Sequence, residues 1–586
     1  MGRLNKSTTQ NINYMSISER KSTIEAWESI SWELVEYRVH RVQRRIYKAS
    51  FLGNQEQLFW LQNKLIRSPD AQVLAVRLVT RLYKHLYINR TSKLSDIPDQ
   101  QKLKISRQLQ LDGSAISNLE LFIQPKYKET HLVDLQFIID KAKQVLVKFV
   151  LEPEWEARFE ENSYGGRSGR SIHDAIEEIF VSMSNKSNNY IAEYDIKTVI
   201  DKIQPIFIIQ KLNTFSQMNK QIQAWLNSSI LTEYMLLLDS NLELPQLINL
   251  KHVSILAPLL INVLLCDLEE YIYTLYRISS NIYNLQHNQV SIKKPFSFIR
   301  DTHKFIFIHE NPLQMRFIMA QTYKWLLLTG VPISRNNFRF SKGTEGFTFR
   351  GFQVIQIKQL DKYKIKITPS RIERINLLLK VRTILQKNKS ASAFNLICFL
   401  RPVILGWANY FRHCECKDIF DKMSYQIFGQ LRAWVFRRDT RNGRSIVKEN
   451  YFPSHNMYTY EGKLRKDRWV LFGSTKDLNG KVRTTHLPKI SWVARLPYIK
   501  IKANYSPYNG DHIYWSKRDT NYPGIPISLQ TLLVKQNHLC AKCNKSFLTS
   551  TEFEIAHISP TQSLGKEDVC NLQVLHHTCH TNRTVI

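Results

Sequence analysis

Two pairs of residues that can bind a metal ion, both near the C-terminus, most strongly constrain how this chain folds. Cys540 and Cys543 form one pair, His576 and Cys579 form the other, and two residues separate the members of each pair. Thiolate and imidazole groups at this spacing typically hold one Zn²⁺ ion in tetrahedral geometry. We therefore expect residues 530–586 to form a compact module around structural zinc. The simplest such module is a zinc knuckle that binds DNA or RNA without cutting it.

The net charge indicates the class of partner. The 586 residues include 82 Lys and Arg against 50 Asp and Glu, which gives a net charge of +32. So large an excess repels itself unless a polyanion neutralises it, and nucleic acid and anionic membranes are the two candidates. The most apolar stretch, Val253 to Leu265, is too short to span about 30 Å of hydrocarbon. We therefore expect a protein that binds nucleic acid, with no membrane span and no signal peptide.

Length and cysteine content narrow the class further. A chain of 586 residues is too long for one hydrophobic core, so several domains are expected. Its eight cysteines are too few for a disulfide framework, which favours a reducing compartment.

Hydrophobic periodicity divides the chain into six regions. An apolar stripe that includes Leu34, Val39 and Ile46 predicts helix near the N-terminus. Short β-rich runs, at Tyr190 to Ile196, Phe305 to Ile308 and Phe347 to Gln356, predict an α+β domain in the middle of the chain. We predict, in order, a basic helical segment at 21–84, a linker or insertion at 85–120, the α+β domain at 121–360, a helical domain at 361–440, an irregular basic connector at 441–529 and the zinc module at 530–586.

The C-terminal module resembles a known family of nucleases. His557 follows Glu554-Ile-Ala, Asn571 precedes an apolar run, and His580 comes directly after Cys579. This order is similar to that of HNH endonucleases, which have the ββα-metal fold. The resemblance implies that His557 is the general base, that Asn571 orients it, and that His580 binds Mg²⁺ or another divalent ion. The family normally has Asp or His before the base, as a further metal ligand, where this chain has Ala556.

A second resemblance covers most of the chain. Residues 163–171 read Ser-Tyr-Gly-Gly-Arg-Ser-Gly-Arg-Ser, and His173-Asp174-Ala follows. This motif resembles one in the reverse transcriptase domain of group II intron-encoded proteins, with Gly166 and Ser168 in place of the family's Phe and Pro. Residues 27–80, 349–352 and 406–412 resemble the family's N-terminal segment, the last palm strand and the maturase domain X.

The resemblance implies a fold and a set of RNA contacts. The expected fold is multidomain α+β, with right-hand-like reverse transcriptase fingers and palm, a helical thumb (domain X) and the C-terminal zinc-containing HNH module. Arginines suit phosphate contacts because the guanidinium group is planar and always charged. The arginines expected to contact RNA are Arg44, Arg45, Arg167, Arg170, Arg371, Arg374, Arg401 and Arg412.

The polymerase site departs from the family. Reverse transcription needs carboxylates that hold two Mg²⁺ ions. Asp195 matches the first of these, but His303 and Lys304 stand where the family has the two aspartates of Tyr-Ala-Asp-Asp. Asp301 lies too early to replace an adjacent pair, and a lysine places a positive charge where a cation should bind. We therefore expect no polymerase activity.

Together these features predict a group II intron maturase that binds intron RNA and promotes its splicing. Two alternatives remain open: an HNH endonuclease that nicks double-stranded target DNA in intron mobility, and a residual RNA-directed DNA polymerase. The many Ile, Lys and Asn residues suggest an AT-rich genome. That composition favours an organelle, the chloroplast first, with the mitochondrion and the bacterial cytoplasm as alternatives. The oligomeric state is not predicted.

Overall fold

A computed structural model describes most of the chain as a mixed α/β protein. The described residues are 26–83, 97–116, 135–184, 188–228, 230–238, 255–284, 296–359, 362–438, 440, 442–476, 482–518, 527–544, 553–558, 572–576 and 579.

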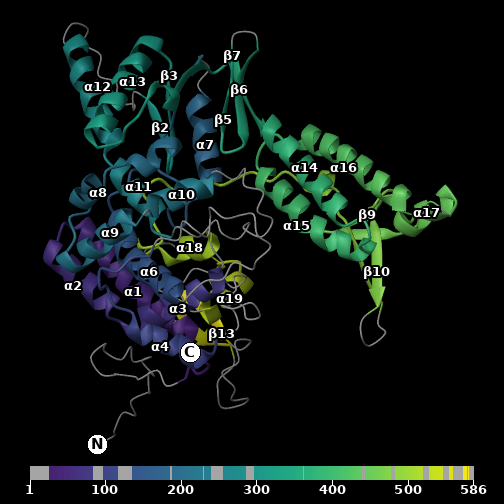
Figure 1. The fold of residues 1–586 in the computed structure, drawn as a ribbon, viewed down its shortest axis with the longest axis horizontal. Helices are drawn as coiled ribbons and strands as arrows, with labels where there is room; N and C mark the ends of the chain where they lie inside the picture. The colour runs from purple at the N-terminus through teal and green to yellow at the C-terminus, as the bar shows by residue number, and fades with distance from the viewer. Residues whose placement is uncertain are drawn as a thin grey trace, which may run out of the picture.

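Helices form the N-terminal part of the molecule (Figure 1). Helix α1 turns Val35, Val39 and Ile46 into the core, whereas Leu34 of the predicted stripe is 52% exposed. Helices α1, α2 and α3 all pack on α6. Local sequence sets where they begin, because Asn54 accepts a hydrogen bond from the backbone of Gln57 at the start of α2. The bounds are α1 Trp32–Phe51, α2 Gln55–Ile66, α3 Pro69–Leu82, α4 Asp99–Gln108 and α6 Leu135–Glu156.

Helix α4 lies in the stretch 85–120, where the sequence suggested a linker or insertion. It packs against α3, and Leu103, Ile105 and Leu109 are buried in the same core as α1 and α6. The weak periodicity of this stretch hid the helix, because polar residues fill most of its surface and few apolar ones anchor it. The described part of the region therefore belongs to the N-terminal domain.

An antiparallel sheet with strand order β2-β3-β1-β4 forms the centre of the α+β region. Both faces are covered, since along β3 Phe305 and Phe307 join the core of the N-terminal helices while Ile306 and Ile308 join a second core. The strand runs predicted at 190–196 and 305–308 are confirmed as β1 and β3. The strands are β1 Tyr190–Asp195, β2 Ser297–Asp301, β3 Lys304–His309 and β4 Phe338–Lys342.

Helices surround this sheet and lead into it (Figure 1). Helix α7 contacts β2, and α13 contacts β1 and β3. Proline begins α8 and α13, where its missing N–H has no helical partner to lose. The helices are α7 Ile172–Met183, α8 Pro205–Leu212, α9 Ser216–Asn227, α10 Ile230–Leu238, α11 Ala257–Leu265, α12 Leu268–Asn284 and α13 Pro312–Leu328, with 3₁₀ turns at Lys197–Lys202 and Arg335–Asn337.

A second sheet leads to a helical bundle, which lies to the right in Figure 1. Strands β5, β6 and β7 pair antiparallel, so the predicted run 347–356 is confirmed as strand, and the first residues of the region expected to be helical form β7. Ser370 and Ser392 cap α14 and α15. The elements are β5 Phe347–Phe349, β6 Phe352–Gln359, β7 Lys362–Pro369, α14 Arg371–Lys387, α15 Ala393–Phe411, α16 Lys417–Arg438 and α17 Arg444–Tyr451. We call α14 to α17 the bundle.

Helix α15 is long and apolar enough to cross a membrane by length and composition, and no other helix in the described ranges passes that test. Leu396, Ile397 and Leu400 of α15 are buried against its neighbours, as in the core helix of a bundle.

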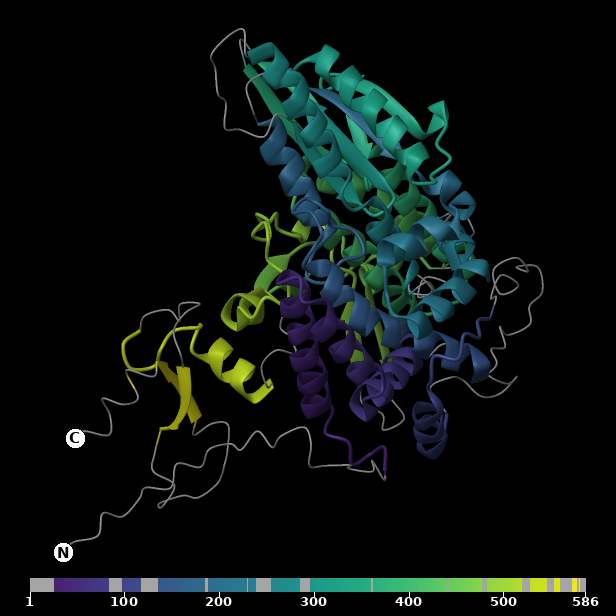
Figure 2. The same cartoon turned by 90° about the vertical axis from the view of Figure 1, so that its left-hand side faces the viewer.

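The region 441–529 is more ordered than expected. It contains two β-hairpins, of which β10–β11 packs on α15, and Trp492 after them contacts Tyr458 and His486. Residues 494–518, which we call the strap, then return to the N-terminal helices and end in α18 (Figures 1 and 2). The described elements are β8 Met457–Tyr460, β9 Lys463–Lys466, β10 Phe472–Lys476, β11 Val482–His486, a 3₁₀ turn at Ile490–Trp492, α18 His512–Arg518, α19 Ile527–Lys535, β12 Phe553–His557 and β13 Leu572–His576.

Candidate metal and nucleic-acid sites

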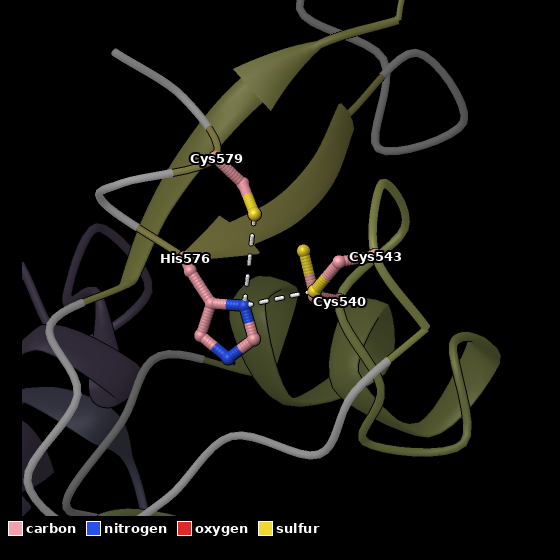
Figure 3. Close-up of side chains that lie close together, drawn as sticks. All are labelled: Cys540, Cys543, His576 and Cys579. Carbon is pink, nitrogen blue, oxygen red and sulfur yellow. Dashed lines mark hydrogen bonds between the residues drawn. The ribbon is translucent and has the colours of Figure 1, made fainter. Parts of the chain in front are cut away.

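Four side chains near the C-terminus converge on one point (Figure 3). Cys540 and Cys543 come from the loop after α19, His576 ends β13, and Cys579 follows it. Their ligand atoms all lie within 4.8 Å of one another, and the Cys543 Sγ is 3.3 Å from the His576 Nδ1. The ligand atoms of a tetrahedral Zn²⁺ ion are about 3.3–3.8 Å apart. A small inward movement of the four side chains would bring their ligand atoms to these separations. The geometry therefore fits a structural metal ion such as zinc.

The pKa values of two of these thiols are shifted in opposite directions. Burial acts to raise the pKa of the Cys540 thiol, but hydrogen bonds from the backbone of Cys543, His576 and Lys542 outweigh it and lower the pKa to about 6. Burial and the neighbouring thiols Cys543 and Cys540 raise the pKa of Cys579 to about 11. Thiolates crowded together repel one another unless a cation lies between them.

The structure describes the predicted nuclease residues only in part. His557 ends β12, opposite Leu572 of β13, and the residue before it, Ala556, is buried. Asn571 and His580 lie outside the described residues, as does any helix of the ββα fold after Cys579. The pairing of β12 with β13 brings His557 and the start of β13 to the same end of the hairpin.

The hairpin β2–β3 has the position expected for the polymerase carboxylates. Asp301 pairs with Lys304 across a two-residue turn of Thr302 and His303, and Thr302 has a φ of +52°. Lys304 also lies opposite Asp195 of β1, and the backbone N–H of Ile196 donates to the His303 carbonyl. The predicted residues Asp195, His303 and Lys304 therefore do come together in space.

Lys304 and Asp195 already bind other groups of the protein, and His303 is buried. The Lys304 ammonium donates to the Thr348 carbonyl at 2.8 Å and lies 3.8 Å from the Glu193 carboxylate. Asp195 accepts a hydrogen bond from the backbone of Lys197. His303 is 3% exposed, and burial together with the charge of Arg350 holds its pKa well below the usual value, so the ring is neutral.

Asp301 does not rescue the site. Its carboxylate forms an ion pair with Arg350, whose φ is +47°. The backbone of Gly165 approaches so closely that a Cβ there would collide with the side chains of Asp301 and Thr302. The space beside Asp301 is therefore filled by the motif at 163–171.

Several of the predicted RNA-binding arginines lie on the surface. Arg45 is exposed on α1, Arg371 on α14 and Arg401 on α15. Arg374 is half-buried and donates to the Ser370 carbonyl, while Arg412 pairs with Glu461 and donates to the carbonyl of residue 494. The exposed guanidinium groups on α14 and α15 are the ones best placed to meet phosphates.

The other predicted RNA contacts face the protein interior. Arg167 is 6% exposed and binds both carboxylate oxygens of Glu156, at 2.8 and 2.9 Å. Arg170 donates to the carbonyls of Glu161, Ala503 and Tyr505, and burial and the charge of Arg167 lower its pKa to about 10. Its position under the strap, like the buried ion pair of Arg167, gives it a structural role in place of the expected RNA contact.

Arg44 is also engaged by the strap. One guanidinium nitrogen lies 2.8 Å from the His512 Nε2. Burial and the charge of Arg44 lower the pKa of His512 to about 4, although Asp511 acts to raise it, so the neutral imidazole accepts this hydrogen bond.

Sequence reasoning missed two residues that organise these sites. Glu193 is the acid partner of Lys304, and Asp174, which is 0% exposed, binds the strap through both carboxylate oxygens. Alternation along β1 places Glu193 next to the expected site. Nothing local to Asp174 identifies partners that lie more than 300 residues later in the chain.

Comparison with known proteins finds three families that match separate parts of the chain. The N-terminal domain of reverse transcriptase matches residues 27–110, the maturase-specific domain of group II introns matches residues 375–452, and HNH endonuclease matches residues 540–585. The first match includes α4, which agrees with its place in the N-terminal core.

Individual relatives span most of the chain. Maturase-like protein 1 of Euglena gracilis is 24% identical over 412 residues, which cover 69% of this chain and 80% of that protein. Maturase-like protein 1 of Euglena longa is 20% identical over 446 residues, covering 74% and 87%. An uncharacterized 91 kDa protein in cob intron from Schizosaccharomyces pombe is 32% identical over 139 residues, covering 23% and 16%. The matched domains, their order and these relatives make the chain similar to group II intron-encoded maturase proteins.

Proposed function

We propose that this protein is a group II intron maturase, which binds intron RNA and promotes its splicing. The observation that carries the proposal is the maturase-specific bundle, which presents exposed arginines on α14 and α15. The net charge of +32 supplies the long-range attraction that a large, folded RNA requires. The catalytic groups of splicing would belong to the RNA, so the protein needs only to hold the RNA in its active shape.

The same proposal includes loss of polymerase activity. Two Mg²⁺ ions need carboxylates on both strands, and Lys304 and His303 supply a cation and a buried neutral ring there. Primer extension that disappears in Asp195→Ala would contradict this part of the proposal and support residual RNA-directed DNA polymerase activity.

Exposed arginines of the bundle provide the direct test of RNA binding. Arg371→Gln with Arg401→Gln should weaken binding and lower the slope of log affinity against log salt by about one for each lost phosphate contact. The matched control, Arg371→Lys with Arg401→Lys, keeps both charges and should keep most of the slope. If the Gln variant and the unmodified protein gave equal slopes, Arg371 and Arg401 would not contact the RNA phosphates.

A second candidate function is DNA nicking by the C-terminal module. The HNH match and the complete Cys and His set favour it. His557 would act as general base, with Asn571 and His580 in their family roles and Mg²⁺ or another divalent ion as cofactor. A supercoiled DNA substrate tests the idea, because nicking by this module must require a divalent ion and must stop in His557→Ala.

We also propose that the C-terminal module holds a zinc ion. Zn²⁺ held by Cys540, Cys543, His576 and Cys579 would be structural, since all four positions come from the protein and no ligand position stays open.

We place the protein in an organelle, with the chloroplast as the first candidate. The relatives from Euglena and the composition of the chain support this assignment.

A further inference from the structure

The strap, residues 494–518, touches three parts of the molecule that are far apart in sequence. It begins at the C-terminal end of α15, crosses the start of α7, and ends as α18 beside α1 (Figure 1). Each of these contacts has its own hydrogen bonds and buried side chains.

The first contact holds the end of α15. The backbone N–H of Leu496 donates to the Arg412 carbonyl at 3.1 Å, and the Leu496 carbonyl lies 3.0 Å from the His413 Nδ1. Arg412 in turn donates from its Nε to the Ala494 carbonyl at 3.2 Å. The strap therefore starts as an extension of the bundle.

The second contact centres on the buried carboxylate of Asp174 at the start of α7. One oxygen accepts from the backbone N–H of Ile501 and from Arg518, both at 2.7 Å. The other accepts from the hydroxyl of Tyr498 at 3.1 Å and from the backbone of Ser171, where it caps the helix. Beside it Lys500 forms an ion pair with Glu178 of α7.

The third contact joins the strap to the motif at 163–171 and to α1. Trp515 is 1% exposed and lies so close to Gly169 that a Cβ there would collide with the indole ring. Gly169 has a φ of +73°, so the turn and the close approach both require glycine. Tyr508 stacks near His40 of α1, with ring centroids 5.6 Å apart.

Buried anchors of this kind make the strap a fixed part of the fold. Ile501 and Trp515 are each 1% exposed, so folding removes almost all of their apolar surface from water. Arg518 adds a charge pair with one carboxylate oxygen of Asp174, at 2.7 Å. Opening the strap would expose apolar surface and leave a buried carboxylate without its cation.

We propose that the strap fixes the bundle at one orientation relative to α7 and α1, so that the protein offers intron RNA a preformed surface. Asp174 is then a positioning residue, which acts through the strap and does not touch RNA. A polymerase thumb has to adjust as the template moves, whereas a protein that stabilises one RNA shape gains affinity from rigidity. The inference rests on the proposed function for its RNA consequence only.

The experiment measures the orientation directly in the full chain. Spin labels on Cys398, which is exposed on α15, and on Ser184→Cys at the end of α7 report the distance between bundle and α7. The strap is weakened from its own side by Arg518→Met with Lys500→Met, which leaves the capping box of Asp174 in place. Lys517→Met is the matched control, because this lysine is the exposed neighbour of Arg518 on α18.

We expect one narrow distance distribution in the parent protein and in Lys517→Met, and a broad one in Arg518→Met with Lys500→Met. A broad distribution in the parent, or no broadening in the strap variant, would overturn the inference. Circular dichroism of each variant shows whether the helices are intact, so that unfolding is not mistaken for release of the strap.

RNA binding supplies the second readout. The strap variant should lose about tenfold in affinity for folded intron RNA, while a short single-stranded RNA that contacts the bundle alone should bind as before. If the parent protein shows no preference for intron RNA, the proposed function fails, and the distance measurement still decides the role of the strap. Equal loss for both RNAs would instead place the substituted residues in the RNA contact and overturn their role as positioning groups.

Discussion

The hairpin β2–β3 and the C-terminal Cys and His cluster are both candidate metal sites, but they differ in what has been kept. The hairpin keeps its strand pairing and its two-residue turn, while His303 and Lys304 replace the expected carboxylates. The cluster keeps all four ligands around one point, although 32 residues lie between Cys543 and His576.

This difference predicts which of the two sites needs a metal ion to keep its fold. Around the hairpin, Phe298, Phe305 and Phe307 are fully buried, and the Lys304 ammonium supplies a positive charge next to Glu193. That region can lose its ions and keep its shape. The described part of the C-terminal module has a two-stranded sheet and few buried apolar side chains, so we expect its shape to depend on the ion.

Removal of a ligand from the cluster should have the largest effect. Cys543→Ser removes one thiolate, and the apparent binding free energy of structural zinc, about 10–16 kcal/mol, is mostly folding free energy. We expect the variant to lose bound zinc by elemental analysis and to lose amide-exchange protection in β12 and β13. Protection in β1 and β3 should stay unchanged.

Cys398→Ser is the matched control, because Cys398 is exposed on α15, away from the cluster. Full protection of β13 in zinc-free Cys543→Ser would show that the module folds without a metal ion and would remove the contrast between the two sites.

Returning the carboxylates to the hairpin should have an intermediate effect. His303→Asp with Lys304→Asp breaks the largely buried pair of Lys304 and Glu193 and crowds acids around Asp195. We expect a loss of about 3 kcal/mol in the free energy of unfolding without divalent ions, because buried like charges are left unpaired. Millimolar Mg²⁺ should recover part of the loss in the variant and leave the parent unchanged. A parent protein that Mg²⁺ itself stabilises would contradict the assignment of Lys304 as the resident cation.

The pH dependence of the hairpin should give the smallest effect. The pKa of His303 lies well below its usual value, so between the two pKa values the unfolded chain binds a proton that the folded chain does not. Stability therefore falls as the pH drops below about 6.5, by about 1 kcal/mol at pH 5.5 for this one group. Thermal unfolding with zinc present should show that His303→Gln reduces this slope.

His455→Gln serves as the control, because the His455 side chain is exposed. A slope unchanged in His303→Gln would mean that His303 titrates freely in the folded protein, against its buried position.

These comparisons also show what the sequence could predict. The spacing of Cys540, Cys543, His576 and Cys579 predicted a cluster that the structure does bring together, because two ligand pairs need only short turns to form. The positions of His303 and Lys304 beside Asp195 followed from the family motif and the strand pattern. Both are local signals, readable from neighbouring residues.

The sequence did not predict contacts between residues that lie far apart in the chain. The charge of Arg167 and Arg170 suggested RNA, but the sequence does not show that Glu156 faces one of them or that the strap covers the other. The basic composition of 441–529 likewise did not indicate that Tyr458 contacts Trp492 or that the β10–β11 hairpin packs on α15. Burial and distant pairing depend on the whole fold, and local patterns do not report them.

The central claim is that the protein acts through intron RNA. The most direct test is splicing of a group II intron from the same genome, at limiting Mg²⁺ and moderate salt, with and without the purified zinc-loaded protein. The account predicts tight binding that prefers this intron over other RNA of equal length, together with faster splicing. Binding without preference and without acceleration would contradict it, and DNA nicking by the C-terminal module would become the better description of what the protein does.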